Sequence, residues 1–196
     1  WKDLSGNNRH LAPNGPAPAY QPKLIGTLPA LNFDAADSRM TTAAFPISTD
    51  VTVFAVVRYR TPDGWGAIAH HGNRDMDWSL EQNATKANGV THFQSENDNA
   101  GVELTLTKDK DYILYGRIAG STRSYASVTT GASFVQVQGN GNTISAGNKV
   151  LYVGSSDANE DSKAYIGHIL YYNKALTDGE RDQVLIQFAN RSCSVL

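Results

Sequence analysis

Short runs of apolar residues, several alternating with polar ones, follow one another along most of the chain, and clusters of Gly, Asn and Asp separate them. The runs are rich in Val, Ile, Thr, Tyr and Phe, residue types that fit a pleated, half-buried strand. The pattern predicts strands at residues 30–34, 51–60, 66–71, 76–82, 91–96, 101–106, 111–118, 123–128, 133–138, 149–154 and 164–172. This density of short strands favours an all-β fold with two packed antiparallel sheets.

The two ends of the chain follow different patterns. The first forty residues are rich in turn signals, and their repeated prolines exclude them from the central strands of a sheet. Near the other end, Thr177 and Glu180 have the spacing of a capping box, in which each residue's side chain caps the other's backbone N–H. A short helix is therefore predicted, with an apolar stripe that packs on the sandwich: Val184, Leu185 and Phe188.

Length and composition fit a single domain that spans residues 1–196. The hydrophobic fraction of 40% is enough for a core, and the charged fraction of 18% is low for a coiled coil or a disordered chain. A formal net charge of −2 gives no electrostatic reason to expect nucleic acid or an anionic membrane as a partner. No apolar run approaches the roughly 18 residues of a membrane-spanning helix, so membrane insertion is not expected.

Cys193 is the single cysteine of the chain. An intrachain disulfide and a multi-cysteine metal site are therefore excluded. Its thiol is either a simple surface group or one half of a bridge to sequence beyond this chain. We expect a secreted or cell-surface protein in which this chain is one part of a larger, multidomain polypeptide. Glycosylation triplets at Asn83 and Asn190 are compatible with export without establishing it.

Several segments carry a family likeness in their order along the chain. They are Trp1–Asn7 (WKDLSGN), Leu31–Asp34 (LNFD), Val51–Arg58 (VTVFAVVR), Tyr152–Ser155 (YVGS) and the closing Tyr165–Thr177 with Glu180 and Arg181. In these segments the chain resembles the laminin-G-like branch of the concanavalin A-like lectin/glucanase superfamily, although Ala35, His168 and Leu170 depart from the usual residues. The resemblance implies a jelly-roll β-sandwich that binds glycans or protein partners, often with calcium, and in some members cleaves polysaccharides.

The most informative alternation lies in the middle of the chain. Within residues 76–82 the apolar side chains share one face of the predicted strand, and Asp77, Ser79 and Glu81 share the other. Within residues 91–96, one face carries only polar side chains: His92, Gln94 and Glu96.

A hairpin closed by the intervening loop would bring these two polar faces together. The predicted register places Glu81 opposite His92, Ser79 opposite Gln94 and Asp77 opposite Glu96. Side chains directly opposite each other have Cβ atoms roughly 4.5–5.5 Å apart. The sequence therefore predicts a polar surface with a His–Glu pair and two adjacent carboxylates, although an idle solvated sheet face would show a similar alternation.

Further residues are expected to join this surface from neighbouring strands and loops. Acids, amides, His and Arg suit hydrogen bonding to sugar hydroxyls or to a carboxylated sugar. Trp65 follows a turn-like stretch, where its ring either stacks on a sugar or packs against the sheet edge. The predicted ligand-binding set is Arg58, Trp65, His71, Asp77, Glu81, His92, Gln94, Glu96, Tyr115 and Arg117.

One acidic stretch has the composition of a calcium site. Asp157, Asn159 and Asp161 place oxygen ligands at alternate positions, and calcium takes six to eight oxygen ligands. An ordinary solvated turn is the competing interpretation. Zinc is not expected, because adjacent His70 and His71 on a strand point to opposite faces. No glycine-rich phosphate loop is present, so no organic cofactor is expected.

Binding and cleavage of a glycan make different demands on these residues. An enzyme would use Asp77, Glu81, His92 and Glu96, either as the paired carboxylates of a glycosidase or with Tyr115 in a lyase. No complete motif of either class is present. A carbohydrate-binding module needs only static hydrogen bonds and stacking, so this function is favoured. A polysaccharide-cleaving enzyme on the same face and a protein-binding adhesion module are the alternatives.

Overall fold

The structure of the chain is a computed structural model. It describes residues 1–60, 64–72, 77–83, 90–95, 102–128, 134–156 and 160–191. For residues 83, 90–95, 128 and 189–191 within these ranges, the backbone alone is described.

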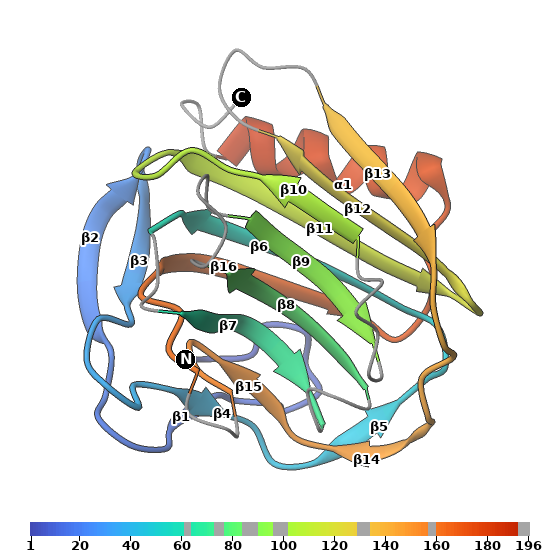
Figure 1. Cartoon of the computed structure of the whole chain (residues 1–196). Coiled ribbons are helices and arrows are strands. Elements are labelled where there is room, and N and C mark those ends of the chain that lie inside the picture. The colour runs from blue at the N-terminus through green and yellow to red at the C-terminus, as the bar shows by residue number, and fades with distance from the viewer. Residues whose placement is uncertain are drawn as a thin grey trace.

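The described residues form two seven-stranded antiparallel sheets (Figure 1). The front sheet has the spatial order β1 (Ala12–Pro13), β4 (Met40–Thr41), β15 (Leu151–Val153), β7 (Trp65–His71), β8 (Trp78–Asn83), β9 (Val90–Ser95) and β10 (Val102–Thr105). The back sheet has the order β13 (Val135–Asn140), β12 (Thr122–Val128), β11 (Asp111–Ala119), β6 (Val51–Arg58), β16 (Tyr165–Tyr172), β3 (Leu28–Asn32) and β2 (Ala19–Ile25). A small extra sheet pairs β5 (Phe45–Ile47) with β14 (Gly147–Lys149).

The two sheets lie face to face, and helix α1 (Asp178–Arg191) covers the far side of the back sheet (Figure 1). The fold is a jelly-roll β-sandwich of two antiparallel sheets with a short C-terminal helix, so the predicted fold class is confirmed. Among the described residues, no helix is both long enough and apolar enough to cross a membrane.

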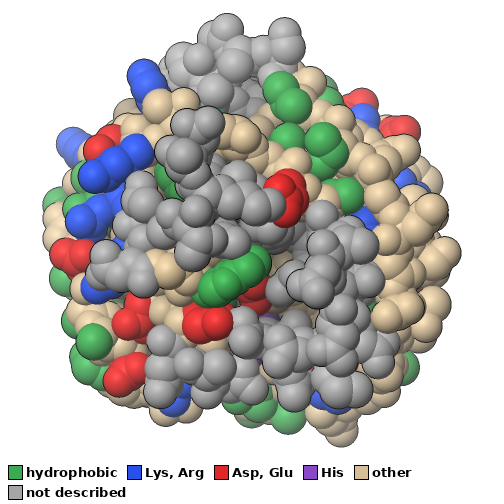
Figure 2. Space-filling model, in the orientation of Figure 1, with side chains coloured by type: hydrophobic (Ala, Val, Ile, Leu, Met, Phe, Trp, Pro, Cys, Tyr) green, Lys and Arg blue, Asp and Glu red, His purple; other side chains and the backbone are tan. Residues whose placement is uncertain are grey.

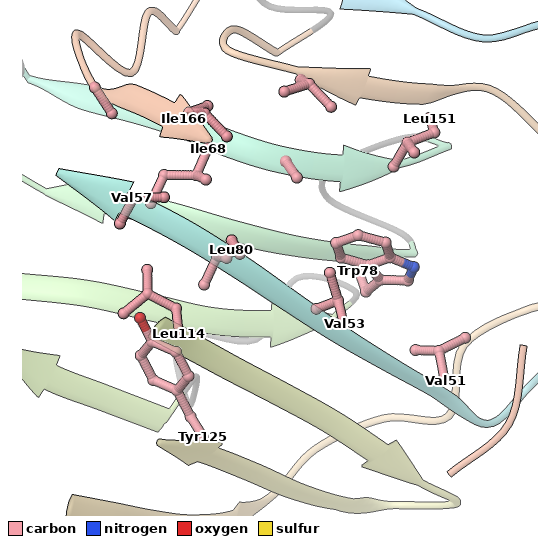
Figure 3. Packing of buried hydrophobic residues seen from close by; sticks show 14 of the residues in the cluster. Val51, Val53, Val57, Ile68, Trp78, Leu80, Leu114, Tyr125, Leu151 and Ile166 are labelled. Atoms are coloured by element: carbon pink, nitrogen blue, oxygen red, sulfur yellow. The ribbon is translucent and has the colours of Figure 1, made fainter. Parts of the chain in front are cut away.

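The main core lies between the two sheets, and β6 is central to it. Alternate residues of β6, including Val53 and Val57, point towards the front sheet, where they meet Ile68 and Leu80 (Figure 3). The intervening residues of β6 are also buried, because they face a second core beneath α1 that includes Phe54. A strand buried on both faces is expected to be apolar throughout, which explains the continuous run of β6.

The helix predicted near the C-terminal end is confirmed. Glu180 Oε2 accepts from the backbone N–H of Thr177 at 2.8 Å, and Thr177 Oγ1 accepts from that of Glu180 at 3.3 Å. The predicted helix stripe packs on the second core: Val184, Leu185 and Phe188. Within the first forty residues, β2 contains Pro22 and forms an edge of the back sheet, as expected for a strand with a proline. The prediction is wrong for β3, which contains Pro29 but lies between β2 and β16. The sequence did not predict β2 or four short strands, β1, β4, β5 and β14.

The backbone at Gly154 packs directly against a core side chain, leaving no room for a Cβ. It has φ +93°, and a Cβ there would overlap the ring of the fully buried Phe33. We expect Gly154→Ala to lower the free energy of unfolding by about 2–5 kcal/mol, through overpacking and left-handed strain. Gly120→Ala is the matched control: its φ is +57° and no atom lies within 4 Å of the added Cβ, so a loss of about 1 kcal/mol is expected. Equal losses in urea unfolding would contradict the overlap.

Candidate functional site

The outer face of the front sheet, which points away from the back sheet, carries the predicted hairpin. Strands β8 and β9 pair with Glu81 opposite His92 and Ser79 opposite Gln94, so the predicted register is confirmed for these two pairs. Trp78 and Leu80 point into the core (Figure 3), and the alternation of a strand therefore turns Ser79 and Glu81 outward. Glu96, the predicted partner of Asp77, lies outside the described residues, as do the side chains of His92 and Gln94.

Three cross-strand rows follow from the pairing on this outer face. One row joins Tyr152, His70, Ser79 and Gln94, the next joins Ala67, Glu81, His92 and Glu103, and the third joins Trp65, Asn83, Val90 and Thr105. Successive rows are two residues apart along a strand, or roughly 7 Å. Glu103, which the sequence analysis did not select, is exposed on β10. It brings a second carboxylate to the row of Glu81.

The polar side chains of β8 are not part of an open solvated surface. Asp77, Ser79 and Glu81 all have no exposed area. An idle, solvated sheet face therefore does not describe this strand, and neither does a row of directly accessible sugar ligands. These side chains form a buried polar layer.

A bulge in β7 decides which of the two adjacent histidines faces outward. Ala67 pairs with Glu81, but Ala69 pairs with Leu80, so one extra residue is inserted between them. The bulge reverses the alternation and turns His70 outward. The His70 ring stacks on Tyr152, with ring centroids 4.4 Å apart and planes 10° apart.

His71 lies in the core, so its predicted place on the polar surface is wrong. Its ring packs against Phe45 at 4.3 Å between centroids and lies edge-on to Tyr171 at 5.2 Å. Nε2 donates a hydrogen bond to the carbonyl of Lys149 at 2.9 Å. Burial lowers the pKa of His71 to about 4, although the bond to Lys149 opposes this shift. His71 is therefore a neutral structural residue at neutral pH.

Asp77 packs between Gly72 at the end of β7 and Lys149 of β14. Its Oδ2 lies 3.4 Å from Nζ of Lys149, and its carboxylate packs so closely on Gly72 that a Cβ there would overlap it. Lys149 thus contacts Asp77 through its ammonium and His71 through its carbonyl. This arrangement ties β14 to the end of the front sheet.

The structure places Arg58, Tyr115 and Arg117 on the back sheet, so their predicted place beside Glu81 is wrong. They point away from the front sheet, on the side that α1 covers. Arg58 forms a bidentate ion pair with Asp111 at 2.7 and 3.1 Å, and the Tyr115 ring packs on Phe54. Arg117 lies 3.9 Å from Asp178 of α1. Strand alternation gave the correct side of each strand, but the two polar sides face opposite directions.

Trp65 is the exposed aromatic residue of the outer face. It opens β7 after Gly64, which has φ +138°, and 39% of its surface is exposed. On the other side of β7 from β8, the backbone of Ala67 contacts the segment of Glu160 and Asp161. Acidic and hydrophobic side chains show beside one another in the middle of this view (Figure 2).

The calcium prediction concerns residues at one edge of this face. Asp157 and Asn159 lie outside the described residues. Both carboxylate oxygens of Asp161 accept from the backbone N–H of Asp37, at 3.0 and 3.1 Å. Within the described ranges, no group of three or more His, Cys, Asp and Glu side chains has the arrangement of a metal site. The metal ligands therefore stay a prediction.

Three residues of this region escaped the sequence analysis besides Glu103. His70 was the alternative to His71, and only a bulge distinguishes them. Tyr152 lies between the buried Leu151 and Val153 of β15, so strand alternation could have placed it on the outer face. Gln82 is fully buried on the core side of β8, and no described residue hydrogen-bonds its amide; its alternation with Trp78 and Leu80 predicts this side of the strand.

The comparisons with known proteins show the fold. No protein-family model matches the chain, and no curated protein matches it in sequence. It is similar in structure to the binding domain of Botulinum neurotoxin DC in complex with SialylT, with a TM-score of 0.66, 11% identity and coverage of 94% of this chain and 48% of that one.

Two further structures have comparable likeness. Tailspike protein 2 from Escherichia coli O157:H7 bacteriophage CAB120 gives a TM-score of 0.65 at 12% identity, over 92% of this chain and 27% of that one. A mutant Trypanosoma rangeli sialidase that displays trans-sialidase activity gives 0.61 at 13% identity, over 85% of this chain and 28% of that one. The chain thus spans less than half of each of these structures.

The neutral state of His71 predicts a specific loss of stability in acid. Its pKa falls from about 6.5 in the unfolded chain to about 4 in the folded protein. The stabilisation is complete above pH 6.5 and is lost as the pH falls towards 4, because the unfolded chain then binds the proton more tightly. The expected loss is about 3 kcal/mol.

The control is His71→Gln, which keeps a donor for the Lys149 carbonyl but does not titrate. Unfolding in urea at several pH values should show that the wild type loses about 3 kcal/mol more than this variant between pH 7 and pH 4. Parallel pH profiles for the two proteins would contradict the buried neutral imidazole.

Proposed function

We propose that the chain is a carbohydrate-binding module of the laminin-G-like, concanavalin A-like kind, and that it holds a glycan on the outer face of the front sheet. The observation that carries this proposal is the exposed ring of Trp65 beside the row of Glu81, His92 and Glu103. An exposed indole offers a flat apolar surface for a sugar ring, and the exposed carboxylate of Glu103 accepts hydrogen bonds from the sugar hydroxyls.

The structural neighbours support a carbohydrate partner. They include a neurotoxin binding domain in complex with SialylT, a phage tailspike and a sialidase. TM-scores of 0.61–0.66 support the shared fold, and at 11–13% identity the activity of any larger protein that contains this chain is part of the proposal. A secreted or cell-surface location and calcium binding near Asp161 belong to the same proposal.

The charges on the outer face favour a neutral glycan. Glu81 and Glu103 lie in one row, and Glu160 and Asp161 adjoin the opposite edge of β7. The described cations of this region are engaged by the protein itself: Lys149 lies 3.4 Å from Asp77, and near Glu160 the side chains of Arg39 and Lys163 donate to backbone carbonyls. A carboxylated or sulfated sugar would meet like charges on this face, whereas a neutral sugar would meet acceptors for its hydroxyls.

Cleavage of a glycan is the second candidate, and the row of Glu81 and Glu103 is what favours it. These glutamates flank His92 from adjacent strands, so their backbones lie about 10 Å apart, a spacing that lets the two carboxyl groups reach the roughly 6.5–9.5 Å separation of inverting glycosidases. Glu81 is fully buried and Glu103 is exposed, and such unlike environments distinguish an acid from a base. Asp77 fits less well, because four residues along a strand span about 13 Å.

Substitution of Trp65 tests the binding site. We expect Trp65→Ala to weaken binding to neutral soluble polysaccharides such as mannan or β-glucan by about tenfold or more, because the stacking surface is lost. Affinity electrophoresis and calorimetry measure this. Phe134→Ala is the control: that ring is also 39% exposed but lies against Arg181 of α1. Equal effects of the two variants would contradict the site, and preference for alginate or pectate would contradict the neutral glycan.

An assay of product formation distinguishes binding from cleavage. Incubation with the same polysaccharides should release no new reducing ends and no unsaturated uronides, with calcium or with a chelator present. Release that is abolished in both Glu81→Gln and Glu103→Gln would establish the enzyme instead. A chelator that leaves glycan affinity unchanged would remove calcium from the proposal.

A further inference from the structure

A pocket opens at the margin of the sandwich, away from the outer-face site, between the N-terminal segment and strands β2, β3, β4 and β16. We call it the edge pocket. Its volume is about 280 Å³. The walls that matter for its chemistry are Trp1, Tyr20, Pro29, Leu31, Met40 and Ile166. None of the residues assigned above to glycan binding lines it, so the inference below is independent of the proposed function.

The walls of the edge pocket are held in place by backbone pairing. The N-terminal nitrogen of Trp1 donates to the carbonyl of Leu11 at 2.6 Å, and the N–H of Leu11 donates to the carbonyl of Trp1 at 2.9 Å. Tyr20 of β2 pairs directly with Leu31 of β3. Met40 lies in β4 at the edge of the main core. The pocket is therefore built from fixed elements on both sides.

The lining selects an uncharged, flat group. It consists of Trp, Tyr, Pro, Ala, Leu, Met, Ile and Gly, without any charged side chain. Aromatic and proline rings present flat faces, and the thioether of Met40 adds a polarisable contact that suits aromatic ligands. The Tyr20 side chain is 66% exposed, and an apolar ring beside an open apolar pocket marks a surface that a ligand would cover.

The volume of the edge pocket limits the size of the ligand group that it can hold. A protein cavity of about 150 Å³ lined by apolar side chains accommodates benzene. At about 280 Å³, the edge pocket has nearly twice that volume, which corresponds to two fused rings. From the lining and the volume together, we propose that the edge pocket is a binding site for an uncharged aromatic group of indole or naphthalene size.

Indole is the probe for this site, titrated into the whole chain and followed by calorimetry and ligand-observed NMR. We expect saturable 1:1 binding with a Kd below about 1 mM, as small apolar ligands reach in well-formed pockets. Indole-3-carboxylate should bind about tenfold more weakly or worse, because the lining has no charged side chain and the Trp1 amine already donates to the Leu11 carbonyl, so the desolvation of the carboxylate is not offset. Failure of indole to saturate, or equal binding of the carboxylate, would overturn the proposal.

A substitution that fills the edge pocket tests whether indole binds there. Ala17 is exposed and lines the pocket, whereas Ala19 is exposed two residues further along and does not line it. Ala17→Leu should weaken indole binding by about tenfold or more through loss of volume, and Ala19→Leu should leave it unchanged. Should Ala17→Leu not fold, Tyr20→Ala replaces it and should also weaken binding. Trp65→Ala should retain full affinity for indole. Unchanged affinity in the pocket variant would place indole elsewhere and refute the site.

Discussion

The burial of β6 between two layers is the constraint on which the rest of the structure depends. One side of the strand meets the front sheet through Val53 and Val57, and the other meets α1 through Phe54. The strands of the front sheet that face β6 bury their apolar sides in the layer between the sheets. For β8 this requirement turns Trp78 and Leu80 inward, so its polar side chains face outward. The position of the polar layer is thus a consequence of core packing, whatever its function.

The same constraint explains what the sequence could predict. The strict alternation of residues 78–81 and 92–94 excludes a register shifted by one residue, because that shift would turn the apolar positions of one strand away from the core side, and the observed pairing agrees with the predicted one. The capping box was equally predictable, because it is a local hydrogen-bonding pattern within four residues. Alternation specifies the side of a strand but does not say which sheet the strand joins. Arg58 and Arg117 were therefore assigned to the wrong surface.

Two other features depend on tertiary structure and had no signal in the sequence. A single inserted residue in β7 exchanges the roles of His70 and His71, and no local pattern marks the bulge between Ala67 and Ala69. The complete burial of Asp77 and Glu81 was also not predictable, because a polar residue on the outer side of a strand is normally solvated. Periodicity gives the direction of a side chain, whereas burial depends on everything packed above it.

That burial changes what the outer face can do. A buried charge is tolerated only with compensating contacts. Asp77 has such a contact, because the ammonium of Lys149 lies 3.4 Å from its carboxylate. The neighbouring His70 ring stacks on Tyr152. Removing such contacts to reach a sugar would cost free energy that a weak glycan contact does not return. In the proposed site, the buried polar layer is therefore mainly a rigid support, and contact with a glycan is assigned to exposed side chains at its margin. Trp65 and Glu103 have that exposure, which is why the site is better defined by the ends of β7 and β10 than by the centre of β8.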